Sequence, residues 1–144
     1  MLKSLTIKNY LLIDELSVLF NNGFTVITGE TGAGKSILVG GISLILGKRA
    51  DLSVNRDKTK KCIIEGVFDI GSYDLKSFFQ EQEIDYDIET ILRREISSSG
   101  KSRAFINDSP VNLNQLSNIG SKIIDIHSQP VSYTHLTLPT KRIV

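Results

Sequence analysis

With 144 residues, 40% of them hydrophobic and 23% charged, the chain can form one domain with a substantial core and is too apolar to be disordered. Its formal net charge of +1 excludes an overall electrostatic attraction to nucleic acid, so any such binding must depend on a local surface. The single cysteine, Cys62, excludes an internal disulfide and a metal site built from cysteines. The longest expected apolar helix is far too short to cross a membrane, so we expect a cytoplasmic protein.

The first part of the chain predicts short antiparallel strands. Residues 2–9 and 15–20 alternate loosely between apolar and polar side chains, as half-exposed strands do. Residues 21–23 then supply a turn from residue types that tolerate a positive φ. Residues 24–28 are rich in β-branched side chains and predict a short buried strand.

The next eight residues fit the phosphate-binding pattern G-x-x-x-x-G-K-[ST] without a mismatch: Gly29, Glu30, Thr31, Gly32, Ala33, Gly34, Lys35 and Ser36. Glycines have no Cβ, so the backbone N–H groups can approach phosphate oxygens at the N-terminus of a helix. We expect Lys35 to reach the β- and γ-phosphates and the Ser36 hydroxyl to bind Mg²⁺. The alternative is a glycine-rich turn that matches by chance, which the preceding strand and following helix disfavour.

Residues 37–46 predict a helix that is apolar on nearly every side and therefore buried between layers. Gly40 and Gly41 would weaken such a helix, so we expect it to pack tightly against a neighbouring backbone. Gly47 is suited to cap its C-terminus. The polar residues 51–61 predict a surface loop, in which the lysines at 58, 60 and 61 are interpreted as solvated.

The remaining chain alternates strands with short helices. Residues 62–70 predict a strand and residues 73–82 a short helix. Residues 90–96 and 102–107 flank a serine- and glycine-containing turn, which predicts a β-hairpin. Residues 112–120 predict a capped helix that ends at Gly120, and residues 122–127 a buried strand.

Four basic residues fall on the predicted hairpin: Arg93, Arg94, Lys101 and Arg103. They could form a surface that contacts phosphates, as in nucleic-acid binding. They could instead belong to an ordinary charged sheet face, which is the interpretation we favour.

Several segments of the sequence resemble the RecN family of bacterial DNA double-strand-break repair proteins, which are related to SMC and ABC-type ATPases. The resemblance covers about residues 1–129 and is carried by residues 5–9, 25–36, 46–51, 92–94, 102–107 and 124–129. It implies an α/β P-loop NTPase fold, the N-terminal lobe of an ABC/SMC-type head, with an antiparallel β subdomain. In this family the head is assembled from both ends of one long chain, so the resemblance implies an incomplete head here.

The resemblance also implies the site and its ligands. It adds Gln129, matching the Q-loop glutamine, to the eight loop residues, with Ser36 and Gln129 as Mg²⁺ ligands and ATP as the nucleotide. The implied partners are DNA, the missing C-terminal lobe and a second head in a homodimer, with no membrane. On this basis the intact protein would hydrolyse ATP between engaged heads and act on the bacterial nucleoid in recombinational repair.

The sequence departs from the family pattern in ways that limit activity. We expect no Walker B run of four apolar residues followed by Asp-Glu, and interpret residues 123–125 as the nearest segment. A signature motif and coiled-coil heptads are also missing, so we expect these residues alone to be inactive, with exposed sheet edges. Residues 130–144 look like translated adapter or vector sequence and are expected to be unstructured.

Other functions stay open as alternatives. Another SMC- or RecF-like repair ATPase head would share the architecture. A non-catalytic DNA-binding or scaffold module with a vestigial loop is a further alternative, which the intact Lys35 and Ser36 disfavour. A freestanding GTPase would need an Asn-Lys-x-Asp motif, and a kinase would need a lid, neither of which we find.

Overall fold

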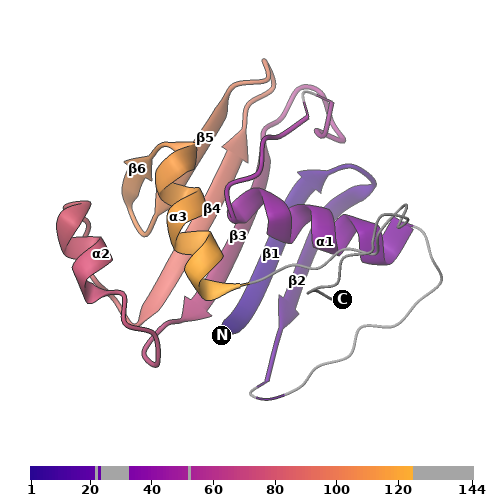
Figure 1. Cartoon of the computed structure of the whole chain (residues 1–144). Helices are drawn as coiled ribbons and strands as arrows, with labels where there is room; N and C mark the ends of the chain where they lie inside the picture. Colours follow the sequence, from indigo (N-terminus) through magenta and orange to yellow (C-terminus); the bar gives the residue numbers. More distant parts are fainter. Residues whose placement is uncertain (22, 24–32, 52, 125–144) are drawn as a thin grey trace, which may run out of the picture.

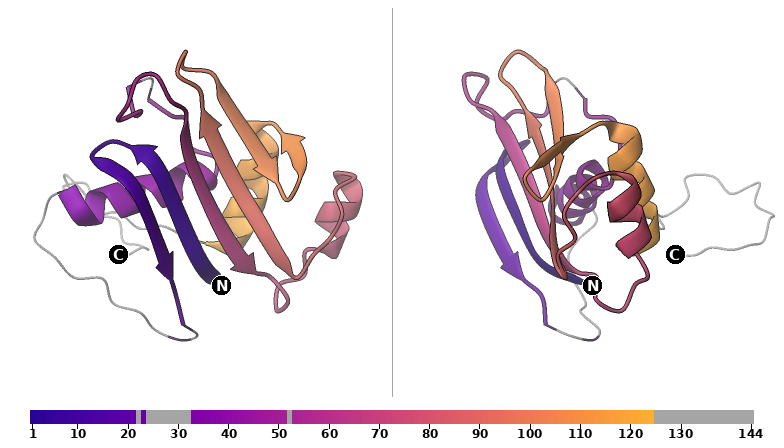
Figure 2. Two further views of the ribbon diagram at one scale, coloured as in Figure 1. Left: turned by 180° about the vertical axis from the view of Figure 1, so that it is seen from behind. Right: turned by 90° about the vertical axis from the view of Figure 1, so that its left-hand side faces the viewer.

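A computed structural model describes residues 1–21, 23, 33–51 and 53–124 (Figure 1). The elements, in chain order, are β1 (Leu2–Tyr10), β2 (Ile13–Leu19), α1 (Ala33–Ile45), β3 (Cys62–Asp69), α2 (Lys76–Glu81), β4 (Glu89–Ile96), β5 (Ser102–Ile106), β6 (Ser109–Val111) and α3 (Leu113–Ile123). The strands form one six-stranded antiparallel sheet in the order β2-β1-β3-β4-β5-β6. The helices lie on one face of this sheet (Figure 2).

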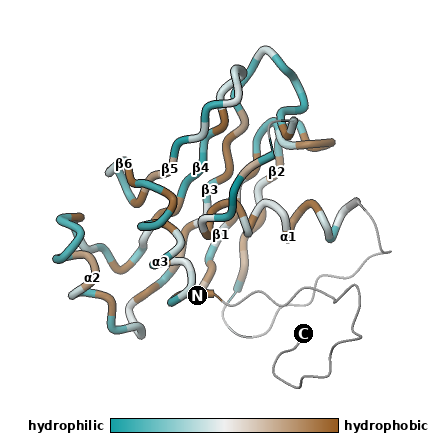
Figure 3. The backbone as a smooth tube through the Cα atoms, turned by 45° about the horizontal axis from the view of Figure 1, so that its top comes forward, coloured by the Kyte–Doolittle hydropathy of each residue, from teal (hydrophilic) through white to brown (hydrophobic). Residues whose placement is uncertain are grey.

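The core lies between the sheet and the helices. Along β3 and β4, buried side chains alternate with half-buried or exposed ones, because successive side chains of a strand point to opposite faces. Figure 3 shows how apolar and polar residues are distributed along the strands and helices. The largest fully buried apolar side chains of the strands include Ile7, Ile64, Phe68, Leu92 and Ile106. None of the described helices is long and apolar enough to cross a bilayer.

The strands predicted at residues 2–9, 15–20, 62–70, 90–96 and 102–107, including the β4–β5 hairpin, are confirmed to within two residues at each end. The short strand β6 was not predicted, because Pro110 argues against a strand except at a sheet edge, where β6 lies. The predicted strand at residues 24–28 lies outside the described residues, as do residues 130–144.

Helix α1 is less buried than its apolar sequence predicts. Ile37, Leu44 and Ile45 are buried, whereas the side chain of Val39 is 43% exposed. Gly40 and Gly41 do pack tightly, but against side chains rather than a backbone: a Cβ at Gly40 would lie 2.7 Å from Tyr10 Oη.

The C-terminus of α1 is capped at Gly47, as predicted. Gly47 has a φ of +100°, and the N–H groups of Gly47 and Lys48 donate to the carbonyls of Leu44 and Ser43. This pair of hydrogen bonds is the Schellman arrangement, which uses a left-handed residue to satisfy the last carbonyls of a helix.

Helix α3 begins as predicted but continues past Gly120. The Asn112 side chain accepts the N–H of Gln115, whose side chain accepts the N–H of Asn112, forming a capping box. The prediction that the helix ends at Gly120 is wrong, because α3 extends to Ile123. A Cβ at Gly120 would lie 2.9 Å from the Leu46 carbonyl oxygen, so this glycine allows close helix packing instead of a cap. Lys122 and Ile123 are consequently helical, and the rest of the predicted strand lies outside the described residues apart from Ile124.

Candidate nucleotide-binding site

Four of the predicted phosphate-binding residues, Ala33, Gly34, Lys35 and Ser36, lie in the first turn of α1. Gly34, Lys35 and Ser36 are all exposed, and a Cβ at Gly34 would meet nothing within 4 Å. The first N–H groups of a helix have no acceptor within the helix and carry the positive end of its dipole. This turn therefore offers N–H donors, an ammonium group and a hydroxyl to an anion. The other predicted site residues, Gly29, Glu30, Thr31, Gly32 and Gln129, lie outside the described residues.

A pocket of about 510 Å³ adjoins this turn. Three segments line it, namely the β1–β2 turn, the start of α1 and the connection from α1 to β3, through Leu11, Leu12, Ser36, Ile37, Ser53, Asn55, Arg56 and Lys58. Its volume lies within the range of small-molecule sites, and its mixture of apolar walls with a few polar groups is typical of them. Apart from Ser36, sequence reasoning did not find these residues as a site, because no motif joins segments so far apart.

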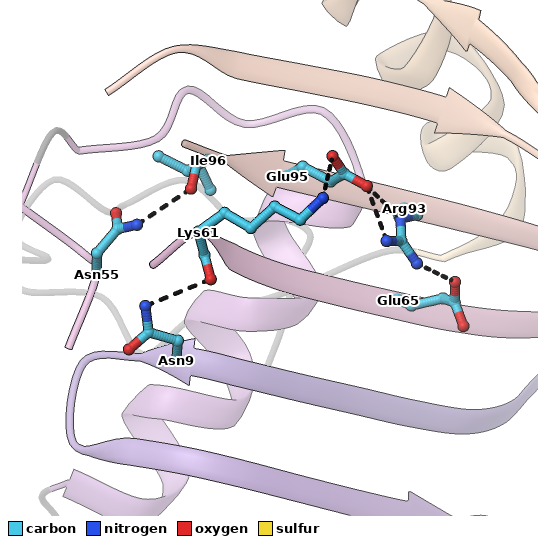
Figure 4. A network of polar contacts seen from close by, with 7 residues as sticks. All are labelled: Asn9, Asn55, Lys61, Glu65, Arg93, Glu95 and Ile96. Carbon is cyan, nitrogen blue, oxygen red and sulfur yellow. Dashed lines mark hydrogen bonds and ion pairs between the residues drawn. The ribbon is translucent and has the colours of Figure 1, made fainter. Parts of the chain in front are cut away.

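The connection that carries Arg56 and Lys58 is fixed by two buried asparagines (Figure 4). At the end of β1, Asn9 Nδ2 donates to the carbonyls of Asp57 and Lys60, each at 3.0 Å. Asn55 Nδ2 donates to the carbonyls of Lys60 at 2.9 Å and Ile96 at 3.1 Å. The segment predicted to be a plain surface loop is thus pinned to β1 and β4, and Asn55 also forms a β-bridge with Tyr10 of β1.

The basic residues of the β4–β5 hairpin do not form a single surface. Arg93 lies on the sheet face away from the helices, where it pairs with Glu65 at 2.9 Å and Glu95 at 2.8 Å (Figure 4). Arg94 points to the opposite face and is fully buried. Neighbouring strand residues alternate between faces, so Arg93 and Arg94 form neither one phosphate-contacting surface nor one charged sheet face, and both interpretations are wrong for this pair.

Arg94 binds the C-terminal end of α1. Its Nη1 donates to the carbonyls of Leu44 and Lys48, both at 2.7 Å, and its Nη2 donates to Ser102 Oγ at 2.6 Å. Burial lowers the pKa of this guanidinium. The same burial raises the pKa of the Cys62 thiol to about 11, an effect that the nearby Arg94 charge opposes.

The exposed Ser36 hydroxyl is compatible with its predicted role as a Mg²⁺ ligand, because it borders the pocket. Within the described part of the chain, no group of three or more His, Cys, Asp or Glu side chains could hold a metal on its own. A phosphate-bound Mg²⁺ fits this arrangement, since such ions take few protein ligands.

The expectation that the chain has no run of apolar residues followed by Asp-Glu is wrong, because one such run is present. It extends from Tyr10 to Glu15 and superficially resembles a Walker B segment. The structure places it across the β1–β2 turn, with Asp14 and Glu15 exposed on the edge strand β2. Neither carboxylate lines the pocket, so the run does not supply an acidic residue to the candidate site.

Comparisons with known proteins find similar sequences over most of the chain. A family model described as an AAA domain matches residues 4–140. The DNA repair protein RecN of Bacillus subtilis (strain 168) is 44% identical over 131 residues, which cover 90% of this chain and 23% of that protein. RecN of Vibrio cholerae is 41% identical over 130 residues, covering 90% of this chain and 24% of the relative. The chain thus spans about a quarter of the length of these relatives, and the resemblance to RecN proteins is confirmed.

Solved structures with the same fold include ATPase heads. An Smc head domain from Pyrococcus furiosus with an extended coiled coil matches with a TM-score of 0.66 and 19% identity, covering 84% of this chain and 32% of that one. A structure of the recombination mediator RecF with ATP matches with a TM-score of 0.61 and 16% identity, covering 81% and 30%. These similarities confirm the predicted fold class, the N-terminal lobe of an SMC-type P-loop head with an antiparallel sheet.

Proposed function

This chain belongs to the AAA domain family, and on that premise we propose that it is the ATP-binding N-terminal lobe of a RecN-like DNA repair ATPase. The observation that carries the proposal is the exposed turn of Gly34, Lys35 and Ser36 next to a pocket of about 510 Å³. The similarity to RecN over 90% of the chain supports the choice of repair protein over a kinase or GTPase.

The described residues suggest how ATP would bind. Its phosphates would meet the N-terminal turn of α1, where Lys35 neutralises charge on the β- and γ-phosphates. Its base and ribose would enter the pocket against Leu11, Leu12 and Ile37, with Arg56 on the wall contributing positive charge. We propose that Gly29, Glu30, Thr31, Gly32 and the backbone of Ala33 complete the phosphate loop.

Ser36 and Gln129 would hold Mg²⁺, which offsets phosphate charge when it is bound. Of these two residues, only Ser36 lies in the described part of the chain. The Ser36 hydroxyl is positioned one residue beyond Lys35 on the same exposed turn, so ligand and cation can serve the same phosphates.

Hydrolysis requires parts that these residues do not supply. We propose that the intact protein hydrolyses ATP between two engaged heads, with a carboxylate from the C-terminal lobe activating the water. DNA, that lobe and a second head would be its partners, and it would act in the cytoplasm on the nucleoid in recombinational double-strand-break repair. Residues 1–129 would form the lobe, and a non-native tail at 130–144 stays a prediction.

Equilibrium binding of a fluorescent ATP analogue in the presence of Mg²⁺ tests the proposal. Lys35→Ala should weaken binding about 10- to 100-fold, because a hydrogen bond to a charged group contributes about 1.5–3 kcal/mol. Lys101→Ala removes the same charge from the exposed β4–β5 turn and should leave the affinity unchanged. A parent chain that does not bind the analogue, or a Lys35→Ala variant that binds equally well, would contradict the proposal.

Turnover provides a second measurement. We expect negligible ATP hydrolysis by the 144 residues alone, because no Walker B carboxylate follows the phosphate loop. Brisk hydrolysis that Lys35→Ala abolishes would show that the catalytic groups have been misassigned. A scaffold module with a vestigial loop would give neither binding nor turnover.

A further inference from the structure

We infer that Arg94 is a positioning residue for the proposed nucleotide site: it fixes the C-terminal end of α1 and thereby sets where the other end presents Lys35 and Ser36. The inference rests on the proposed function. It adds a residue that no phosphate-binding motif contains and that lies far from the loop in sequence.

The contacts of Arg94 all concern the end of α1 or the neighbouring strand. One nitrogen, Nη1, donates to two carbonyls, those of Leu44 and Lys48, at 2.7 Å each. These two carbonyls flank the Gly47 cap, so a single guanidinium spans the point where the helix stops. The other nitrogen, Nη2, donates to Ser102 Oγ at 2.6 Å and ties the same group to β5.

The electrostatics favour this placement. Carbonyls at a helix C-terminus carry the negative end of the helix dipole and attract a cation. No carboxylate pairs with Arg94 among the described residues, and its Nε has no hydrogen-bond partner. A fully buried cation with an unpaired donor contributes little to the free energy of folding, since apolar residues of similar volume often give equal or higher stability. Its geometric effect on α1 is therefore the property that distinguishes it from an apolar core residue.

The opposite side of the same helix end is also constrained. A Cβ at Gly47 would lie 2.7 Å from the Ser117 backbone nitrogen, and a Cβ at Gly120 would lie 2.9 Å from the Leu46 carbonyl oxygen. Helix α3 thus lies directly against the end of α1, and Arg94 holds that end to the sheet. With both contacts made, the helix end has little freedom to shift.

A fixed end determines the position of the other end because the helix is short and stiff. Helix α1 has 13 residues, which corresponds to roughly 20 Å of length. A small tilt at Leu44 would displace the first turn, and misplacement of about 1 Å is enough to impair a site built on charge and hydrogen bonds. Arg94 acts on phosphate binding through this helix and has no assigned contact with the nucleotide.

Four variants of this chain separate positioning from stability. Arg94→Met keeps the bulk and removes the hydrogen bonds, whereas Arg94→Lys keeps the charge but loses the planar group that reaches several acceptors. Ser102→Ala removes one contact at an exposed residue and should fold normally. Ile106→Val is the control, because it removes one methylene group from the buried core on β5 and leaves the hydrogen bonds to the carbonyls of α1 in place.

Each variant is measured for affinity of the fluorescent ATP analogue, melting temperature and hydrogen exchange of the amides at residues 37–39, the first amides of α1 whose i−4 carbonyl lies within the helix. We expect affinity to fall tenfold or more in Arg94→Met, three- to tenfold in Arg94→Lys and two- to threefold in Ser102→Ala. Exchange at residues 37–39 should accelerate in the Arg94 variants at temperatures where the chain is folded. Ile106→Val should lower the melting temperature but keep affinity within twofold and exchange at residues 37–39 unchanged.

The outcomes distinguish the two proposals. If the parent chain binds the analogue and the Arg94 and Ser102 variants bind equally well, positioning by Arg94 is wrong while the proposed function stands. If Ile106→Val loses affinity in proportion to its melting temperature, the effect of Arg94 is general stability and the inference is also wrong. A parent chain that binds no nucleotide overturns both. If Arg94→Met does not fold, the affinities of Arg94→Lys and Ser102→Ala test the inference, and unchanged affinity in both overturns it.

Discussion

Asn9 and Asp57 hydrogen-bond in both directions: Asn9 Oδ1 accepts the backbone N–H of Asp57 at 2.6 Å, and Asn9 Nδ2 donates to the Asp57 carbonyl at 3.0 Å. Asn9 has a φ of +56°, a left-handed conformation that asparagine tolerates better than most residues. The same amide also reaches the carbonyls of Lys60 and Lys61. One side chain thus fixes the connection that brings Arg56 to the pocket wall.

Asn9→Asp tests this arrangement with nearly unchanged shape. Aspartate keeps the acceptor for the Asp57 N–H but places a second oxygen against the three carbonyls that Nδ2 now contacts. We expect a loss of about 2–3 kcal/mol in the free energy of unfolding, because a buried donor is replaced by an unpartnered charged acceptor.

Urea denaturation measures this loss, and Asn118→Asp on the exposed side of α3 provides the matched control. The control should change the free energy of unfolding by less than about 0.5 kcal/mol. Equal stability of the two variants would mean that the Asn9 amide does not hold the connection.

Asn9 also shows which parts of the fold the sequence could predict. Residues 2–9 predict a strand because side chains of alternating polarity are a local signal of period two. The hydrogen bonds from Asn9 cross 48 to 52 residues of sequence, and no local pattern encodes them. The connection at 51–61 was therefore predicted to be a plain loop, although Val54 and Asn55 are buried in it.

In the candidate site, too, the residues with a local sequence signal could be predicted and those brought together by distant contacts could not. Lys35 and Ser36 could be predicted because phosphate binding uses consecutive residues with a fixed spacing. The pocket residues Leu12 and Arg56 could not, since they meet only when the β1–β2 turn and the α1–β3 connection fold together. Gly120 was misread because glycine serves both as a helix cap and as a point of close packing, and the sequence does not distinguish the two.

The glycine at 47 should tolerate no side chain. It has a φ of +100°, and a Cβ there would lie 2.7 Å from the backbone of Ser117. We expect Gly47→Ala to lower the free energy of unfolding by about 2–5 kcal/mol, because backbone strain and overpacking add. The midpoint of urea denaturation gives the measurement.

Gly23→Ala separates the two contributions to this loss. Gly23 has nearly the same φ, +96°, but a Cβ there would meet nothing within 4 Å. Gly23→Ala should therefore lower the free energy of unfolding by the backbone strain alone, about 1–2 kcal/mol. Similar losses at the two positions would show that α3 can move away from the end of α1, which would also weaken the case for a fixed helix end.

The buried thiol of Cys62 should make stability depend on alkaline pH. Burial raises its pKa from 9.0 to about 11, with the Arg94 charge acting in the opposite direction. Between about pH 9 and 11 the unfolded chain releases the thiol proton while the folded chain retains it, so stability falls as the pH rises through this window. Below pH 9 both states hold the proton and the contribution is constant.

Comparison of the parent chain with Cys62→Ala isolates this contribution, because other titrating groups, such as Tyr10, are present in both chains. The difference between their urea midpoints should be constant from pH 7 to 8.5. By pH 10.5 the midpoint of the parent chain should have fallen relative to that of Cys62→Ala. Alkylation at pH 8 should be slow in the folded chain and fast in urea, since the thiol is fully buried and its thiolate is scarce. A pH-independent difference together with rapid alkylation of the folded chain would show that Cys62 is accessible, and hence that the packing between β3 and the Arg94 side chain is looser than described.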